Sequence, residues 1–159
     1  ITLENIYIFS TGAIDLCTPA KLRGLMRYKL FAVTHRLLCQ TEPTANRALL
    51  LRERLIEYGN DEGHLELLGL WFKGKCKELE NHKLTKANEW AIVKKIYGSK
   101  VVSLDEKREY LEAMKAKDAG DMAKVVEKGL EGLMVPKEKR KAVFEGFVKQ
   151  GQDSVRMAG

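Results

Sequence analysis

Apolar residues recur at intervals of three and four along most of the chain, which is the spacing of an amphipathic helix. The first long helix is predicted over residues 18–40, with Thr18 as its N-cap and Pro19 at its first position. Its predicted apolar face consists of five residues: Leu22, Met26, Leu30, Val33 and Leu37. Basic residues border this face, and their alkyl stems are expected to cover the edges of the core.

The same spacing, together with turn and cap signals, predicts further helices. They cover residues 42–60, 61–81, 85–98, 103–117 and 118–132, and a last one begins at Pro136. Ser103 and Glu106 have the spacing of a capping box. Trp71, Phe72 and Trp90 lie among aliphatic residues at helical spacing, so they are expected in the core rather than stacked on nucleic-acid bases.

The opening segment, residues 3–10, is compatible with a short helix or a buried strand, but no partner strand is evident. The chain is therefore predicted to be all-α, with seven or eight helices in one compact bundle or in two small packed helical subdomains. Residues 1–159 are expected to form a single helical domain, with a soft boundary near residues 98–102.

Composition agrees with a folded protein, since 45% of the 159 residues are hydrophobic and 31% are charged. The formal net charge is +6, and it is unevenly spread. Residues 1–80 hold 11 Lys and Arg against 10 acids, whereas residues 81–159 hold 17 against 12. Residues 81–159 are therefore expected to bind an anionic partner, such as nucleic acid, an acidic protein or a phospholipid surface.

No signal peptide or transmembrane segment is predicted, because no basic n-region or long apolar run occurs. Cys17, Cys39 and Cys76 are an odd and widely spaced set, which favours free thiols over a disulfide framework. The expected location is an intracellular, reducing compartment, with peripheral attachment to a membrane as a further option.

No motif for catalysis or for a cofactor is evident, so the chain is expected to be non-enzymatic, without a cofactor or small-molecule substrate. His35 and Cys39 lie four residues apart on a predicted helix, where a nucleophile–base pair would be in reach, but no orienting third group is apparent. With Cys76 and His82 they would supply four zinc-type ligands. The spacing lacks a C-x₂-C pair, and a single helical Cys is more often a small buried hydrophobe. No metal site is therefore predicted. His64, in the first turn of a helix, is expected at the surface.

The helix predicted from Pro136 begins with an unusual concentration of cations: Lys137, Lys139, Arg140 and Lys141. Cations in a first turn oppose the helix macrodipole by about 0.3–1 kcal/mol each. Free backbone N–H groups beside Lys and Arg are, however, well suited to a phosphate. These residues, helped by Lys94 and Lys95, are the predicted anion-binding site, against the alternative of a solvated basic surface.

The segment 127–150 resembles the amino-terminal domain of orthomyxovirus matrix proteins. The residues that carry the resemblance are Lys128, Gly129, Gly132, Val135, Pro136, Glu138, Lys139, Arg140, Phe144 and Phe147. The resemblance implies a helical matrix domain that self-associates in a layer beneath a viral membrane and contacts anionic lipid and ribonucleoprotein. It also implies a location in a virion.

The sequence thus leads to three hypotheses about function. The first is a non-enzymatic, self-associating helical scaffold or assembly protein whose basic surface binds an anionic phospholipid membrane or RNA in a ribonucleoprotein. The second is a helical adaptor that recognises an acidic protein partner. The third is an enzyme that uses Cys39 or a pair of carboxylates, since a fold does not determine a function.

Overall fold

The structure is a computed structural model that describes residues 2–118, 120, 124 and 128. By the contacts between its residues the chain divides into two units, Ile1–Lys107 and Arg108–Gly159. Across the described residues the secondary structure is helical, without a strand. The all-α prediction is therefore confirmed, and the soft boundary near residues 98–102 stays a prediction.

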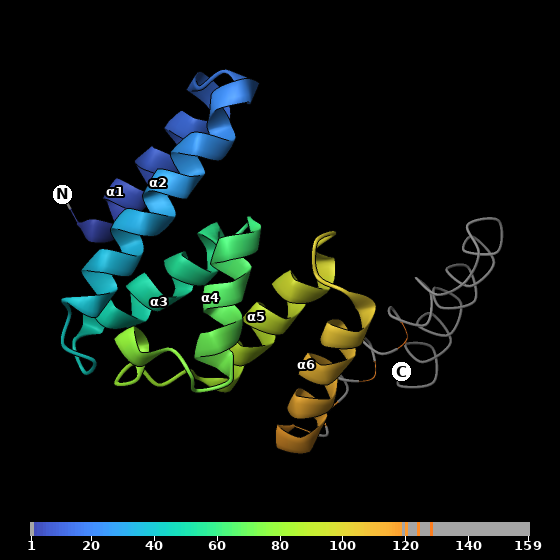
Figure 1. Cartoon of the computed structure of the whole chain (residues 1–159). Helices are drawn as coiled ribbons and strands as arrows, with labels where there is room; N and C mark the ends of the chain where they lie inside the picture. The colour runs from blue at the N-terminus through green and yellow to red at the C-terminus, as the bar shows by residue number, and fades with distance from the viewer. Residues whose placement is uncertain (1, 119, 121–123, 125–127, 129–159) are drawn as a thin grey trace, which may run out of the picture. The chain divides into compact units, whose positions relative to one another are not determined.

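The described part of the chain holds six α-helices, one π-helical turn and one 3-10 turn (Figure 1). In order they are α1 (Leu3–Gly12), η1 (Ala13–Cys17), α2 (Ala20–Cys39), α3 (Asn46–Tyr58), α4 (Glu62–Phe72), η2 (Lys77–Leu79), α5 (Lys86–Gly98) and α6 (Leu104–Lys117). Most of residues 118–132 and the whole helix expected from Pro136 lie outside the described residues, so the total of seven or eight helices stays a prediction.

The opening segment, which the sequence left open between helix and strand, forms α1. Thr2 caps it, because the Thr2 hydroxyl accepts a hydrogen bond from the Asn5 backbone N–H at 3.3 Å. After the turn η1 the chain reverses, so that α1 and α2 lie beside each other as an antiparallel hairpin (Figure 1). The hydroxyl groups of Tyr7 and Thr34 are hydrogen-bonded at 2.9 Å and join the two helices.

The start of α2 and its buried face differ from the prediction. Thr18 does not cap the helix; its hydroxyl donates instead to the Ala13 carbonyl and closes the preceding turn. The buried residues of α2 are Phe31, Thr34 and Leu38, all in its second half, where the helix packs against α3. Two members of the predicted face, Leu22 and Val33, are exposed.

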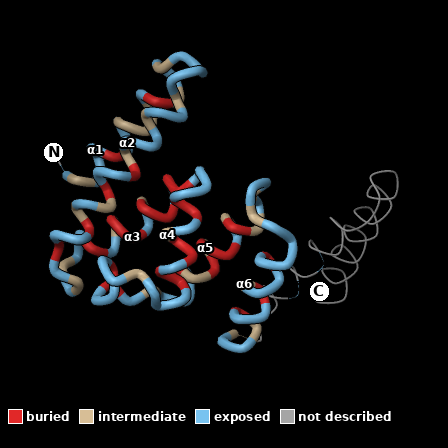
Figure 2. The backbone as a smooth tube through the Cα atoms, in the orientation of Figure 1, coloured by how far each residue is buried: buried red, intermediate tan, exposed pale blue. Residues whose placement is uncertain are grey.

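The core of the first unit lies in α3, α4 and α5, which hold most of its buried residues, whereas the α1–α2 hairpin is largely exposed or half-buried (Figure 2). Trp71, Phe72 and Trp90 are all buried, as predicted. Leu55 and Leu68, on α3 and α4, are fully enclosed. The hydrophobic contribution to folding is therefore concentrated on the three helices that follow the hairpin.

The predicted helix over residues 61–81 is wrong beyond Phe72. Gly74 has a φ of +67°, a left-handed conformation that glycine adopts without steric cost. The Gly74 N–H bonds to the Trp71 carbonyl and the Lys75 N–H to the Leu70 carbonyl. These two bonds form a Schellman motif, which ends α4 and directs the chain into the short turn η2.

Two other helix ends follow the sequence closely. Ser103 and Glu106 form the predicted capping box, with the Ser103 hydroxyl accepting from the Glu106 N–H and the Glu106 carboxylate accepting from the Ser103 N–H, both at 3.2 Å. The helix α5 ends at Gly98, as predicted. Its start carries a second capping box, made by Thr85 and Asn88, which was not predicted from the sequence.

The turn between α3 and α4 requires a residue without a side chain. A Cβ placed on Gly59 would lie 2.5 Å from Leu68 Cδ1 and 3.4 Å from Phe31 Cε2. Because Leu68 is fully buried, it has little room to move away. We expect Gly59→Ala to lower the free energy of unfolding by about 1–3 kcal/mol, measured by urea denaturation followed by circular dichroism.

The matched control is Gly24→Ala, in the middle of α2. A Cβ on Gly24 would meet no atom within 4 Å, so alanine adds helix propensity without overlap. This change is expected to raise the free energy of unfolding, by up to about 1 kcal/mol. Equal effects of the two substitutions would show that the packing around Gly59 is not tight.

Candidate functional surface and side-chain cluster

The structure describes only part of the predicted anion-binding site. Lys137, Lys139, Arg140 and Lys141 lie outside the described residues, as does nearly all of the segment that resembles matrix proteins. Lys94 and Lys95 lie on α5, where the Lys94 side chain is exposed and the Lys95 side chain is half-buried. These six residues stay a predicted site.

Lys95 has a structural role at the end of α3. Its Nζ donates to the Glu57 carbonyl at 2.5 Å and to Asn60 Oδ1 at 2.9 Å. The Glu57 carbonyl is among the last of α3, and such carbonyls lack a partner inside their own helix. Burial lowers the pKa of Lys95 from its usual value, and the charge of Glu57 opposes this effect.

The helix α2 is strongly positive, although residues 1–80 as a whole are nearly neutral. It contains no aspartate or glutamate and carries five cations: Lys21, Arg23, Arg27, Lys29 and Arg36. The first half of the chain is nearly neutral as a whole, because its acids lie on other elements. The local charge of α2 is therefore much higher than that of the segment from which it comes.

Several of these cations lie on one exposed face together with apolar residues. The face, called here the outer stripe of α2, consists of Lys21, Leu22, Leu25, Lys29, Val33 and Arg36, all exposed. Apart from the adjacent pair Lys21 and Leu22, successive members are three or four residues apart, which places them along one side of the helix. The outer stripe thus combines three cations with three aliphatic side chains.

The cations of the outer stripe differ from the other two arginines in their contacts. Arg27 forms an ion pair with Asp15 at 2.6 Å, and Arg23 Nε donates to the Thr18 carbonyl. Lys21, Lys29 and Arg36 form no ion pair with any residue that the structure describes. Within the part of the chain that the structure describes, no carboxylate therefore neutralises these three charges.

The other arm of the hairpin adds exposed apolar area. Ile6, Phe9 and Leu16 recur at helical spacing on α1 and η1, and Phe9 and Leu16 are 71% and 84% exposed. Large apolar side chains exposed in such a group commonly mark an interaction surface. No helix in the described residues combines the length and apolar character needed to cross a membrane.

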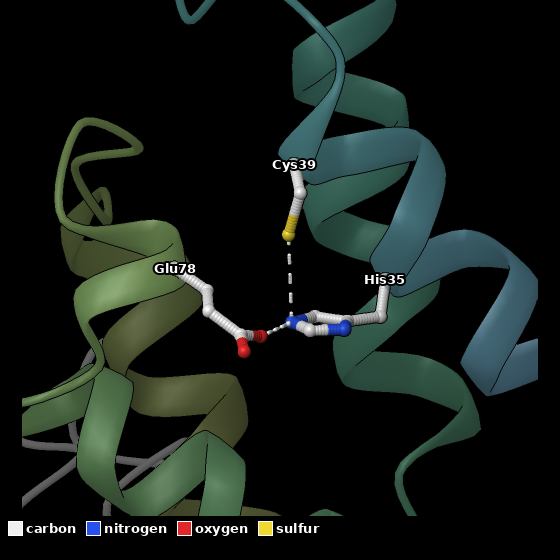
Figure 3. Close-up of side chains that lie close together, drawn as sticks. All are labelled: His35, Cys39 and Glu78. Carbon is white, nitrogen blue, oxygen red and sulfur yellow. Dashed lines mark hydrogen bonds and ion pairs between the residues drawn. The ribbon is translucent and has the colours of Figure 1, made fainter.

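A second group of chemically active side chains joins α2 to η2 (Figure 3). His35 Nε2 lies 3.2 Å from a carboxylate oxygen of Glu78 and 3.6 Å from Cys39 Sγ. The three ligand-type atoms all lie within 4.8 Å of one another. Cys76 lies within electrostatic range of Cys39, so the neighbourhood contains two thiols.

The arrangement of this cluster does not suit a cysteine nucleophile. In a Cys–His–acid triad, the thiol and the carboxylate contact different nitrogens of the imidazole. Here Cys39 Sγ and Glu78 both approach Nε2, so the acid does not orient the base toward the thiol. Burial, together with the charge of Glu78, also raises the pKa of Cys39, which disfavours the reactive thiolate.

The structure revises three expectations about the cysteines and histidines. Cys39 is exposed rather than a small buried hydrophobe, whereas all three cysteines are free, as predicted. His82, considered with Cys76 as a ligand, is buried outside the cluster, and Glu78 takes part instead. His64 is buried rather than exposed, because its ring stacks on Phe31 with centroids 3.6 Å apart. No sequence signal linked Glu78 to His35, since they come from distant segments.

No protein-family model, curated protein or solved structure matches the chain.

Proposed function

We propose that the protein is a non-enzymatic helical scaffold that attaches peripherally to an anionic phospholipid surface through its α1–α2 hairpin. The observation that carries this proposal is the outer stripe of α2, where cations without an ion pair to any described residue lie beside exposed aliphatic side chains. A phospholipid surface can bind both kinds of side chain, because its anionic headgroups attract the cations and the acyl chains beside them contact the aliphatic side chains. Nucleic acid would match the cations but not the exposed leucines.

The expected energies are sufficient for reversible attachment. A Lys or Arg close to an anionic leaflet contributes about 1 kcal/mol, so Lys21, Lys29 and Arg36 together would contribute about 3 kcal/mol. Burying a Phe or Leu side chain fully would add about 1.5–3 kcal/mol. Phe9 and Leu16, the most exposed apolar side chains of the hairpin, supply this second contribution.

The predicted site, which consists of Lys137, Lys139, Arg140, Lys141, Lys94 and Lys95, would add cations to the same kind of contact. In this proposal the helix from Pro136 is one of those that bring the total to seven or eight. The resemblance of residues 127–150 to matrix proteins, and the self-association that it implies, are compatible with a scaffold that accumulates on a surface.

The test is flotation of the full chain with vesicles, across a salt series. We expect binding to phosphatidylcholine vesicles that contain phosphatidylserine, little binding to phosphatidylcholine alone, and weakening as salt screens the charges. The test variant carries three changes: Lys21→Gln, Lys29→Gln and Arg36→Gln. Because about 3 kcal/mol would be lost, its affinity for the anionic vesicles should fall about 100-fold.

The matched control removes the same number of charges from exposed residues elsewhere in the first unit: Arg47→Gln, Lys75→Gln and Lys83→Gln. It should retain most of the binding, since long-range attraction by net charge is screened at physiological salt. If the stripe variant folds and binds as tightly as the control, the hairpin is not the lipid site. Binding to single-stranded RNA with none to vesicles would contradict the lipid proposal and favour a ribonucleoprotein partner.

A further inference from the structure

The cluster formed by His35, Cys39 and Glu78 has the donor atoms and spacing of a metal site. His35 and Cys39 lie one turn apart on the same side of α2. Glu78 is presented by η2, where its neighbour Leu79 is fully buried and anchors the turn. Two different elements therefore direct three ligand-type atoms toward one another (Figure 3).

The distances suit a small ion. In tetrahedral zinc sites the donors lie about 2.0–2.3 Å from the metal, which places them about 3.3–3.8 Å apart. His35 Nε2 lies 3.2 Å from the Glu78 carboxylate and 3.6 Å from Cys39 Sγ, and no pair in the cluster exceeds 4.8 Å. Small side-chain rotations would suffice to bring all three donors into coordination distance.

The donor atoms, one nitrogen, one sulfur and one carboxylate oxygen, indicate which metal the cluster would bind. Calcium and magnesium prefer oxygen ligands, whereas imidazole, thiolate and carboxylate together are a zinc-type set. Cys39 Sγ and the Glu78 carboxylate both lie near the same nitrogen of His35, Nε2. This arrangement does not suit a catalytic triad, but three donor atoms that bind one ion must lie close together in this way.

We infer that His35 Nε2, Cys39 Sγ and the Glu78 carboxylate bind one Zn²⁺ ion, which fastens η2 to the end of α2. Such an ion would fix the loop between α4 and α5 against the base of the hairpin. The inference is independent of lipid attachment, because none of the three ligands belongs to the outer stripe.

The test uses the full chain under reducing conditions, titrated with zinc chloride in a calorimeter and with cobalt chloride in an absorption spectrometer. We expect one equivalent of zinc to bind, the melting temperature to rise, and cobalt to give the charge-transfer band of a metal–thiolate bond. Cys39→Ser should remove that band, and Glu78→Gln should weaken zinc binding about tenfold or more.

The controls are Cys17→Ser and Glu80→Gln, which change an exposed thiol and an exposed carboxylate outside the cluster. Both should bind zinc like the unmodified chain. Since Cys39 and Glu78 are also exposed, their variants are expected to fold, as circular dichroism would verify. Absence of zinc binding at micromolar concentrations would overturn the inference, and so would unchanged zinc affinity in Cys39→Ser.

Discussion

Replacing Leu55 by alanine is expected to lower the free energy of unfolding by about 3 kcal/mol, a large part of the stability of a small domain. Leu55 lies on α3 and is 0% exposed, within the core that α3 forms with α4 and α5. Truncation would remove the transfer free energy of the lost methyl groups and leave a cavity that close-packed neighbours fill only partly.

The same substitution at Leu49 gives the matched control. Leu49 lies on the same helix, with 51% of its side chain exposed, so Leu49→Ala is expected to cost less than about 0.5 kcal/mol. Urea denaturation of both variants, at equal protein concentration, measures the difference. Similar losses at the two positions would mean that α3 does not hold the core.

The helical class of the fold could be predicted because apolar residues recur at helical spacing along the chain, and cap and turn residues mark where helices begin and end. The Ser103–Glu106 capping box and the end of α5 at Gly98 are local features, which depend on a few neighbouring residues. The aromatic core residues were also predictable, since Trp71 and Phe72 stand in a run that is too apolar to remain in water.

The buried face of α2 could not be predicted in the same way. This helix has apolar residues on several sides, so its periodicity does not select one of them. The choice is made by the other helices: Thr34 is hydrogen-bonded to Tyr7 of α1 and Phe31 stacks on His64 of α4, whereas Leu22 and Val33 stay exposed. Burial of His64 has a similar tertiary origin, because the ring of Phe31 comes from another helix.

The two candidate sites differ in how much of them the sequence reveals. The absence of acids from α2 is visible in the sequence, but exposure of its cations beside leucines depends on how the hairpin packs. The pair His35 and Cys39 follows from helical spacing alone. Glu78 joins them only because Gly74 ends α4 and the turn η2 returns to α2.

Trp71 connects the loop between α4 and α5 to the core. Its replacement by alanine is expected to lower the free energy of unfolding more than the loss of Leu55. Its ring is buried, and its Nε1 donates to the His82 carbonyl at 2.9 Å. Arg52 donates to the adjoining carbonyl of Lys83 at 2.8 Å, so two side chains hold neighbouring peptides of the loop. We expect Trp71→Ala to lower the free energy of unfolding by about 4 kcal/mol.

A second substitution separates packing from hydrogen bonding. Trp71→Phe retains an aromatic ring but leaves the His82 carbonyl without its donor, which should cost about 1–3 kcal/mol. Leu70→Ala, one position away and exposed, should cost less than about 1 kcal/mol. All three variants can be compared by urea denaturation. If Trp71→Phe is as stable as the unmodified chain, the bond to His82 contributes nothing, and the loop that carries Glu78 is held by packing and by Arg52.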